Sequence, residues 1–278
     1  QNWQTVLRNT HLEDPNYQSG WINFWGPSVT CLTLSPIKPD RLYFGTSGHV
    51  IRTDDDGRSW EQHYCRQFDD GRIAGTGLEV TCLHNVMPHP RIADKVFFGY
   101  FDIGLLWTDD GGESFRRSVQ GIPRAHQNSC FTMVFDTRDD ARAWAVFGSW
   151  GGGGSGIMAE TRDCGQSWTP LTHENSGLGS DKPGNLTAMP GADGATVLYL
   201  TQKSKGLLHS SDGGQSWQPR NAGLPDTDIR LFAAHPTVAG KMFCLFSAGK
   251  DREPAAYLSQ DGGQSWSKAG DLPCSDLK

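Results

Sequence analysis

Several segments of this sequence place aromatic rings close to carboxyl groups. In one of them Asp102 directly follows two rings, and in another two tryptophans follow Glu13 and Asp14. Aromatic rings stack on the apolar faces of sugars, while carboxylates bond to sugar hydroxyls. The pattern therefore predicts a carbohydrate-binding cleft; the alternative is that the rings only pack long loops onto the body of the protein. The rings expected to contact a substrate are Trp21, Trp25, Tyr100, Phe101 and Trp150.

A pair of acids in such a cleft would add catalysis. Glycoside hydrolysis generally uses two carboxyl groups, about 5 to 9.5 Å apart, and Asp102 is the first candidate for one of them. The candidates for its partner are Asp69, Asp70 and Asp181, unless the partner belongs to another part of the protein. Arg124 and His126, in a third polar segment, complete the expected substrate-binding set. The alternative for Asp102 is that it caps its own turn, two residues before Gly104.

An octapeptide that recurs five times indicates the elements that must position these residues. Its pattern is Ser/Thr-x-Asp-x-Gly-x-Ser-Trp/Phe, and its aspartates are Asp55, Asp110, Asp163, Asp212 and Asp261, spaced by 49 to 55 residues. Around each copy the same order of β-branched and aromatic runs and polar turns returns, without helical periodicity. The repeat length is that of one four-stranded unit, so we predict an all-β fold.

The octapeptide resembles the Asp box, or BNR repeat, of sialidases, endo-xyloglucanases and sortilin-type receptor ectodomains, which are β-propellers. The resemblance covers nearly the whole chain and implies four-stranded antiparallel blades with Asp-box hairpins. The aspartate of each copy is suited to accept backbone N–H bonds across a tight turn, the glycine to supply a positive φ, and the aromatic residue to pack between sheets. We therefore interpret the five aspartates as structural and not as catalytic groups.

The repeat divides the chain into one propeller domain, 1–278, with five blades and one partial blade. The partial blade is expected at 1–7, and the blades at about 28–66, 79–119, 129–172, 185–220 and 228–269. Gln1 to Trp3 match the end of an Asp box, so we expect a fragment of a larger ring, with Trp3 starting an outer strand. Closure removes exposed sheet edges. The alternative is that five blades close alone.

The face opposite the Asp boxes is the expected ligand face. In a propeller this face is built by the loops between second and third strands and by the connections between blades, and Asp102 lies in such a loop. The sequence Asp102-Ile103-Gly104 resembles the D-I-G-G segment that carries a catalytic aspartate in endo-xyloglucanases. Leu105 replaces the second glycine, and the sequence contains no second D-I-G copy to supply the partner acid.

Two hypotheses follow for the function. The first is a carbohydrate-active propeller, a glycoside hydrolase if it is an enzyme, acting on a β-glucan or xyloglucan-like polysaccharide. The second is a non-catalytic scaffold that binds proteins or assists assembly, in the manner of a sortilin-like or assembly-factor-like propeller, because a propeller without a carboxyl pair can still bind peptides. A sialidase-like site is not expected, since the arginines of the ligand face are scattered and no family motif surrounds them.

The composition of the chain limits the kinds of partner that it is expected to bind. Twenty-five Lys and Arg against 31 Asp and Glu give a net charge of −6, which argues against nucleic acid, and no apolar stretch is long enough for a membrane span. The seven Cys show no metal-ligand spacing, and we expect Cys31, Cys82 and Cys130 to be buried. We expect no metal or cofactor. The expected partner is an oligosaccharide or polysaccharide, with another chain as a candidate to complete the ring, and the expected location is extracellular or periplasmic.

Overall fold

The computed structural model describes residues 17–18, 31–35, 38–45, 50–63, 65–76, 82–149, 156–171, 176–179, 181–191, 193–235, 238–247 and 254–271. Their contacts divide the chain into two units. The first consists of residues 1–82 with 108–116, and the second of residues 83–107 with 117–278. Within the described residues the elements are β-strands and one 3-10 turn, Arg124–His126. The part of the chain described here contains no helix with the length and apolar character needed to cross a membrane.

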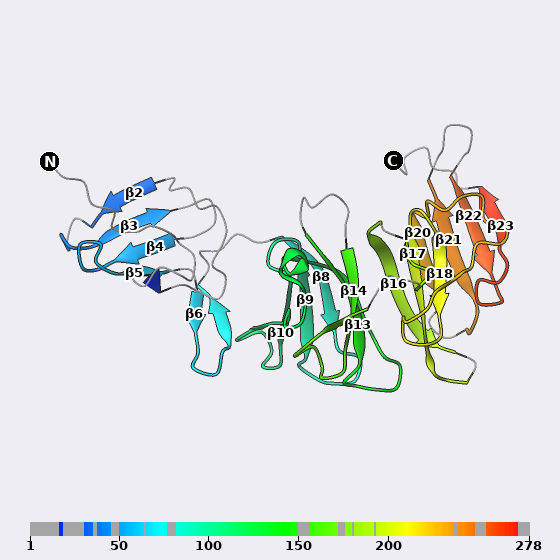
Figure 1. Cartoon of the computed structure of the whole chain (residues 1–278), viewed down its shortest axis with the longest axis horizontal. Helices are drawn as coiled ribbons and strands as arrows, with labels where there is room; N and C mark the ends of the chain where they lie inside the picture. The colour runs from blue at the N-terminus through cyan, green and yellow to red at the C-terminus, as the bar shows by residue number, and fades with distance from the viewer. Residues whose placement is uncertain are drawn as a thin grey trace. The chain divides into compact units, whose positions relative to one another are not determined.

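The first unit holds one sheet and one hairpin (Figure 1). Its strands are β1 (Tyr17–Gln18), β2 (Cys31–Leu34), β3 (Leu42–Gly45), β4 (Val50–Thr53), β5 (Trp60–Gln62), β6 (Cys65–Gln67) and β7 (Ile73–Gly75). The first sheet has the order β1-β5-β4-β3-β2, in which β1 runs parallel to β5 and the other pairs are antiparallel. The β6–β7 hairpin is fastened by a backbone pair between Ile73 and Phe115.

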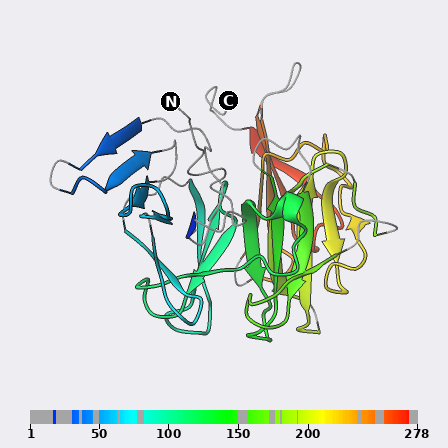
Figure 2. The same cartoon turned by 60° about the vertical axis from the view of Figure 1, so that its left-hand side comes forward.

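Four further sheets each contain four strands in chain order. The second sheet consists of β8 (Leu83–Pro88), β9 (Val96–Tyr100), β10 (Leu105–Thr108) and β11 (Arg116–Arg117), and the third of β12 (Ser129–Phe135), β13 (Ala143–Gly148), β14 (Gly156–Thr161) and β15 (Thr169–Pro170). The fourth consists of β16 (Pro183–Pro190), β17 (Thr196–Gln202), β18 (Gly206–Ser210) and β19 (Gln218–Pro219), and the fifth of β20 (Leu231–Ala234), β21 (Met242–Phe246), β22 (Ala255–Ser259) and β23 (Ser267–Asp271). Within the second unit these sheets follow one another face to face, as Figure 1 and Figure 2 show.

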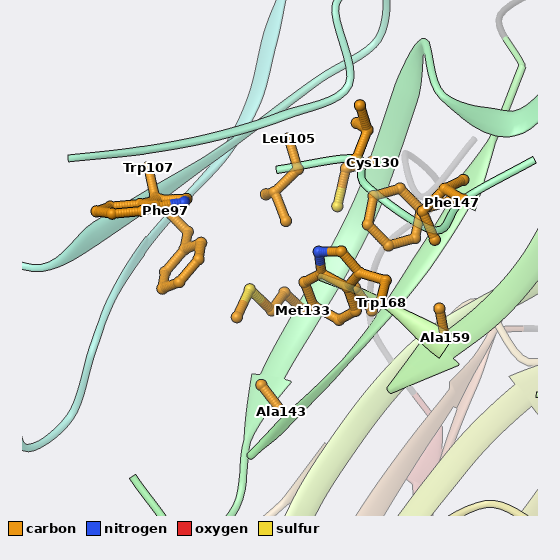
Figure 3. Close-up of a cluster of buried hydrophobic side chains, with 12 residues drawn as sticks. Phe97, Leu105, Trp107, Cys130, Met133, Ala143, Phe147, Ala159 and Trp168 are labelled. Atoms are coloured by element: carbon orange, nitrogen blue, oxygen red, sulfur yellow. The ribbon is translucent and has the colours of Figure 1, made fainter. Parts of the chain in front are cut away.

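Strand β13 shows why successive sheets pack in this way. Its side chains alternate between the two faces of the third sheet, since successive residues of a strand point in opposite directions. Ala145 and Phe147 join the cluster shared with the second sheet, whereas Trp144 and Val146 join the cluster shared with the fourth. Both faces are covered, so every residue of β13 is buried. In the first of these clusters the ring of Trp168 stands edge-on to that of Phe147, with 5.1 Å between centroids (Figure 3).

Three glycines fasten each sheet to the next. Gly121, Gly177 and Gly223 follow the fourth strands of the second, third and fourth sheets and have φ values of +86°, +88° and +91°. A Cβ atom at these positions would lie 2.0, 2.4 and 2.2 Å from the carbonyl oxygen of the Asp-box tryptophan of the following sheet. The backbone N–H of each tryptophan donates to the carbonyl of the residue before the glycine, at 2.7 to 2.9 Å. The three junctions therefore share one backbone geometry that only glycine fits.

The burial of the cysteines differs in part from the sequence prediction. Cys130 is buried as predicted, but Cys31 and Cys82 are exposed, so the prediction for these two was wrong. Cys31 begins β2, whose four residues are all exposed at the end of the first sheet, and Cys82 precedes β8, which opens with exposed Leu83. A shared position in the repeat did not give them a shared environment.

The glycine junctions lead to a stability prediction. Gly121→Ala should lower the free energy of unfolding by about 2 to 4 kcal/mol, because the added methyl must displace the backbone of Trp168 and alanine is strained at this φ. Gly262→Ala is the matched control, since its φ is +73° and the nearest atom to the added Cβ, the hydroxyl of Tyr199, is 3.4 Å away. The control should cost only about 1 kcal/mol. Urea unfolding followed by circular dichroism measures both, and equal losses would contradict the close approach.

Candidate functional site

The turn between β9 and β10 carries Asp102. Tyr100, at the end of β9, donates its backbone N–H to the carbonyl of Gly104 at 2.8 Å and so closes the turn. Ile103 is buried inside it, while Phe101 and Asp102 are half-buried. The buried isoleucine thus anchors the turn and leaves its neighbours on the surface. They lie at the end of β10 opposite to the Asp box of the second sheet.

Gly104 fixes this turn to the connection between the second and third sheets. Its φ is +85°, and a Cβ atom would lie 2.2 Å from the carbonyl oxygen of Gln127. Its N–H donates to the carbonyl of Asn128 at 2.9 Å. Arg117 bridges the two segments by donating to the carbonyls of Ile103 (3.0 Å) and Gln127 (3.1 Å), although burial lowers the pKa of its guanidinium. These contacts explain the glycine of the D-I-G sequence without reference to catalysis.

The same connection holds Arg124 and His126 in its 3-10 turn. Arg124 is exposed. His126 is half-buried, and its Nδ1 atom is buried with no hydrogen-bond partner among the described residues. Since the next two residues contact Gly104, the structure brings the segment of Arg124 and His126 against the turn that carries Asp102.

Phe101 belongs to a row of side chains from three sheets, which we call the aromatic row: His84, Phe101, Phe131 and Lys182. The ring of Phe101 lies 4.3 Å from that of His84 and 5.9 Å from that of Phe131, centroid to centroid. The ammonium of Lys182 lies 3.9 Å from the centroid of Phe131, a cation–π distance. Asn85 holds β8 to β12 by donating to the carbonyl of Phe131 at 2.6 Å. His84 and Lys182 are exposed, so solvent reaches the row.

Sequence reasoning identified Phe101 but missed the other three members of the aromatic row. His84 and Phe131 belong to the first strands of their sheets, and Lys182 immediately precedes the first strand of the next. The signal that was available is this shared position in the repeat.

Asp69 and Asp70 lie at the tip of the β6–β7 hairpin, in the first unit. The predicted blades at about 28–66 and 79–119 left these residues in the connection between them, whereas the structure forms a hairpin there. Asp70 accepts hydrogen bonds from the backbone N–H of Arg72 (3.1 Å) and from its guanidinium (2.8 Å), and pairs with Arg116 at 3.2 Å. The Arg72 bonds, with the charges of both arginines, hold the pKa of Asp70 below its ordinary value. Arg72 also contacts Asp110 at 3.3 Å, so Asp70 lies beside an Asp box.

Asp181, the remaining candidate acid, immediately precedes Lys182 of the aromatic row. The backbone N–H of Ser204 donates to its carboxylate at 3.0 Å, and the Ser204 hydroxyl donates to the other oxygen. Partial burial opposes ionisation, but the bonds from Ser204 outweigh it and lower the pKa of Asp181. Its carboxylate is therefore ionised at neutral pH.

The five Asp-box aspartates accept hydrogen bonds within their own hairpins. Each carboxylate receives the backbone N–H of the serine four residues later, at 2.9 to 3.0 Å, and the hydroxyl of the same serine. It also receives the hydroxyl of the Ser or Thr two residues earlier, at 2.7 to 2.8 Å. That hydroxyl in turn accepts the N–H of the box glycine. Each carboxylate thus closes one turn, and its lone pairs are directed into the hairpin.

These bonds stabilise the charged form of the carboxylates. Bonds from Ser59 lower the pKa of Asp55 to about 2, and bonds from Ser265 do the same for Asp261. The pKa of Asp110 is lowered through Ser114. For Asp163 and Asp212, partial burial acts in the opposite direction, but the serine bonds still lower the pKa.

Other predicted site residues lie outside the described part of the chain. These are Trp21, Trp25 and Trp150, together with Trp3 of the expected partial blade. Among the residues that are described, no three His, Cys, Asp or Glu side chains converge in a group that could hold a metal ion.

Two sequence comparisons relate this chain to known proteins. The family model of the BNR/Asp-box repeat matches residues 257–268. The oligoxyloglucan-reducing end-specific xyloglucanase of Emericella nidulans is 27% identical over 285 aligned positions, which cover 87% of this chain and 34% of that protein. The chain therefore spans about a third of the length of this relative.

Solved structures agree in fold. The GH74 enzyme of Niastella koreensis matches with a TM-score of 0.53 and 15% identity, over 86% of this chain and 38% of that one. An ancestral GH74 enzyme matches with a TM-score of 0.52 and 16% identity, over 87% and 31%, and the GH74 xyloglucanase of Xanthomonas campestris with 0.50 and 16%, over 86% and 38%. The predicted fold is confirmed: the chain is an all-β Asp-box propeller that resembles xyloglucanases.

The lowered pKa values of the box carboxylates predict acid sensitivity. Their ordinary pKa is 3.8, and in the folded chain that of Asp55 and Asp261 is about 2. The unfolded chain then binds protons first as the pH falls, so the stabilisation is complete above about pH 5 and is lost progressively from about pH 4 to pH 2. Urea midpoints measured across this range should fall, and Asp261→Asn should reduce the slope by the share of one carboxylate. A midpoint that does not change between pH 5 and pH 2 would contradict this.

Proposed function

We propose that this chain is part of a carbohydrate-active propeller, a glycoside hydrolase that acts on a β-glucan of the xyloglucan class outside the cytoplasm. The observation that carries the proposal is the position of Asp102, in a turn fixed by Gly104 and beside the aromatic row. The likeness to a xyloglucanase supports the substrate class. That likeness covers 87% of this chain but only 34% of the relative, so the activity is proposed for the protein and not read from the relative.

Asp102 is proposed as the proton donor to the glycosidic oxygen. A general acid must be held within hydrogen-bond reach of the atom that it protonates, and the Gly104 and Arg117 contacts hold the backbone of this turn against the neighbouring connection. Phe101 offers a half-buried ring next to the acid. The apolar face of a sugar would stack on this ring and bring its glycosidic bond to Asp102.

Asp181 is proposed as the second carboxyl group. The role of base or nucleophile requires a carboxylate that is charged at neutral pH, and the bonds from Ser204 favour that form. We assign Asp70 a structural role, because Arg72 and Arg116 already bind its carboxylate. Trp21, Trp25 and Trp150 remain proposed sugar platforms.

Substitution of the acid tests the proposal. Asp102→Asn should lower the rate of reducing-sugar release from xyloglucan a hundredfold or more, while the affinity for a xyloglucan oligosaccharide changes by less than about threefold, since the amide keeps the shape of the side chain. Asp109→Asn is the matched control: it makes the same chemical change in an exposed residue of the Asp box at the other end of β10, and it should leave both quantities unchanged.

A protein that releases no reducing sugar from a panel of β-glucans, and binds none of them in calorimetry, is not a carbohydrate-active propeller. If it binds but does not hydrolyse, only the catalytic assignment of Asp102 and Asp181 fails.

A further inference from the structure

The junctions between the third, fourth and fifth sheets use equivalent aromatic residues. Trp144 of β13 and Tyr199 of β17 occupy the same position, because each lies one residue after the partner of the first Asp-box residue, Thr161 or Ser210. Each donates a hydrogen bond to a carbonyl in the Asp-box turn of the next sheet. Trp144 bonds to Gly213 at 2.9 Å, and Tyr199 bonds to the equivalent glycine at 3.1 Å.

At the junction of the third and fourth sheets the space beneath the Asp box is filled. The indole of Trp144 is fully buried. The guanidinium of Arg142 covers the ring, with its carbon 4.4 Å from the centroid. Glu160, the cross-strand partner of Trp144, holds Arg142 by an ion pair at 2.6 Å. Ring, cation and carboxylate thus pack against and pair with one another at this junction.

At the junction of the fourth and fifth sheets the equivalent space is hollow. The smaller phenol of Tyr199 replaces the indole, and His209 stands at the position of the glutamate. A pocket of about 340 Å³ remains, which is within the range of small-ligand sites. Its walls include the apolar side chains of Met189, Val197 and Met242, and the polar ones of Tyr199, His209 and Arg220. The rings of Tyr199 and His209 lie 5.0 Å apart, centroid to centroid.

One buried hydrogen-bond donor in this pocket is unpaired within the described part of the chain. Arg220 forms no ion pair among the described residues, and its buried Nε atom has no hydrogen-bond partner there. The backbone of Arg220 is held by Leu207 (2.8 Å) and by the indole of Trp266 (2.9 Å), so the residue is fixed at the wall. Asp261 also lines the pocket, but bonds from its own hairpin occupy its carboxylate.

His209 does not add a second positive charge at neutral pH. Burial, and then the charge of Arg220, lower the pKa of its imidazole. A neutral imidazole can donate or accept one hydrogen bond and present its flat face to a ligand. The pocket therefore combines a half-buried cation whose buried Nε–H is unpaired, two ring faces and apolar walls. An unpaired, buried Nε–H on a guanidinium favours a ligand that brings a carboxylate.

We propose that this pocket binds a ligand that carries a carboxylate on a six-membered ring. The carboxylate would pair with Arg220, and the ring would lie against Tyr199 and His209 with the methionine walls around it. Two sources share this chemistry, a uronic acid residue of a polysaccharide and a small aromatic acid. The lining of the pocket includes residues of the fifth Asp box. Asp102 lies instead at the end of β10 that is opposite to the Asp box of the second sheet. The proposal therefore does not depend on the proposed hydrolase activity.

Binding to the full chain tests the proposal, with sodium glucuronate and sodium benzoate as probes and glucose as the neutral control. In nuclear magnetic resonance titrations we expect at least one of the two acids to bind at least tenfold more tightly than glucose. Arg220→Gln should weaken that acid about tenfold or more. Arg230→Gln removes the same charge from an exposed residue that does not line the pocket, and it should change the affinity by less than twofold.

A second variant copies the filled junction into the hollow one. Tyr199→Trp introduces the residue that occupies this position in the third sheet, and it should abolish binding of either acid. Binding of glucuronate alone assigns the pocket to a uronate, binding of benzoate alone assigns it to an aromatic acid, and binding of both supports the shared chemistry. The proposal is overturned if neither acid binds, if glucose binds equally well, or if Arg220→Gln leaves the affinity unchanged. If Tyr199→Trp does not fold, the affinity of the Arg220→Gln variant alone tests the proposal.

Discussion

The close approach between a connection glycine and the next Asp-box tryptophan is the contact on which the rest of the second unit depends. At Gly121, Gly177 and Gly223 the backbone comes so near to the tryptophan carbonyl that no other residue fits without a shift. The contact has two requirements. The glycine must have a positive φ, and the tryptophan must be held in place, which the aspartate bonds of the box and the packing of the indole between sheets both achieve. The Asp box therefore closes its own hairpin and also forms the rigid surface against which the preceding connection packs.

This fixed distance between sheets explains how one strand serves two clusters. With neighbours on both faces, β13 directs Phe147 toward the second sheet and Trp144 toward the fourth, and every side chain loses contact with water. The same principle positions the candidate site. Gly104 approaches the carbonyl of Gln127 as closely as the connection glycines approach the tryptophans. A glycine contact between neighbouring sheets thus holds the turn of Asp102, and burial of Ile103 completes its anchoring.

The fold could be predicted from the sequence because its signal is repeated and local. Five copies of one octapeptide each specify a turn through neighbours in the chain, so a one-dimensional pattern contains the information. The junction glycines were missed although they follow three of the five box aspartates by 11 to 14 residues, because their function is a contact with the next repeat. The aromatic row was missed for the same reason: His84, Phe131 and Lys182 come from three different sheets, and neither hydrophobic period nor spacing shows which first strands meet. The hairpin of Asp70 depends likewise on Arg116, 46 residues away in the chain.

The repeat also separates structural from functional chemistry. Where every copy has the same residue, as at the box aspartates, the side chain bonds to its own hairpin and its lone pairs are used there. Where copies differ, the difference changes what the surface can bind. At one position Trp144 fills a junction that Tyr199 leaves open, and only one of the five sheets carries the D-I-G turn. Substitutions of shared residues should consequently change stability, whereas substitutions of the residues in which one copy departs from the others should change binding or catalysis. The departures from the repeat, and not its most regular feature, are therefore where function is to be sought in this chain.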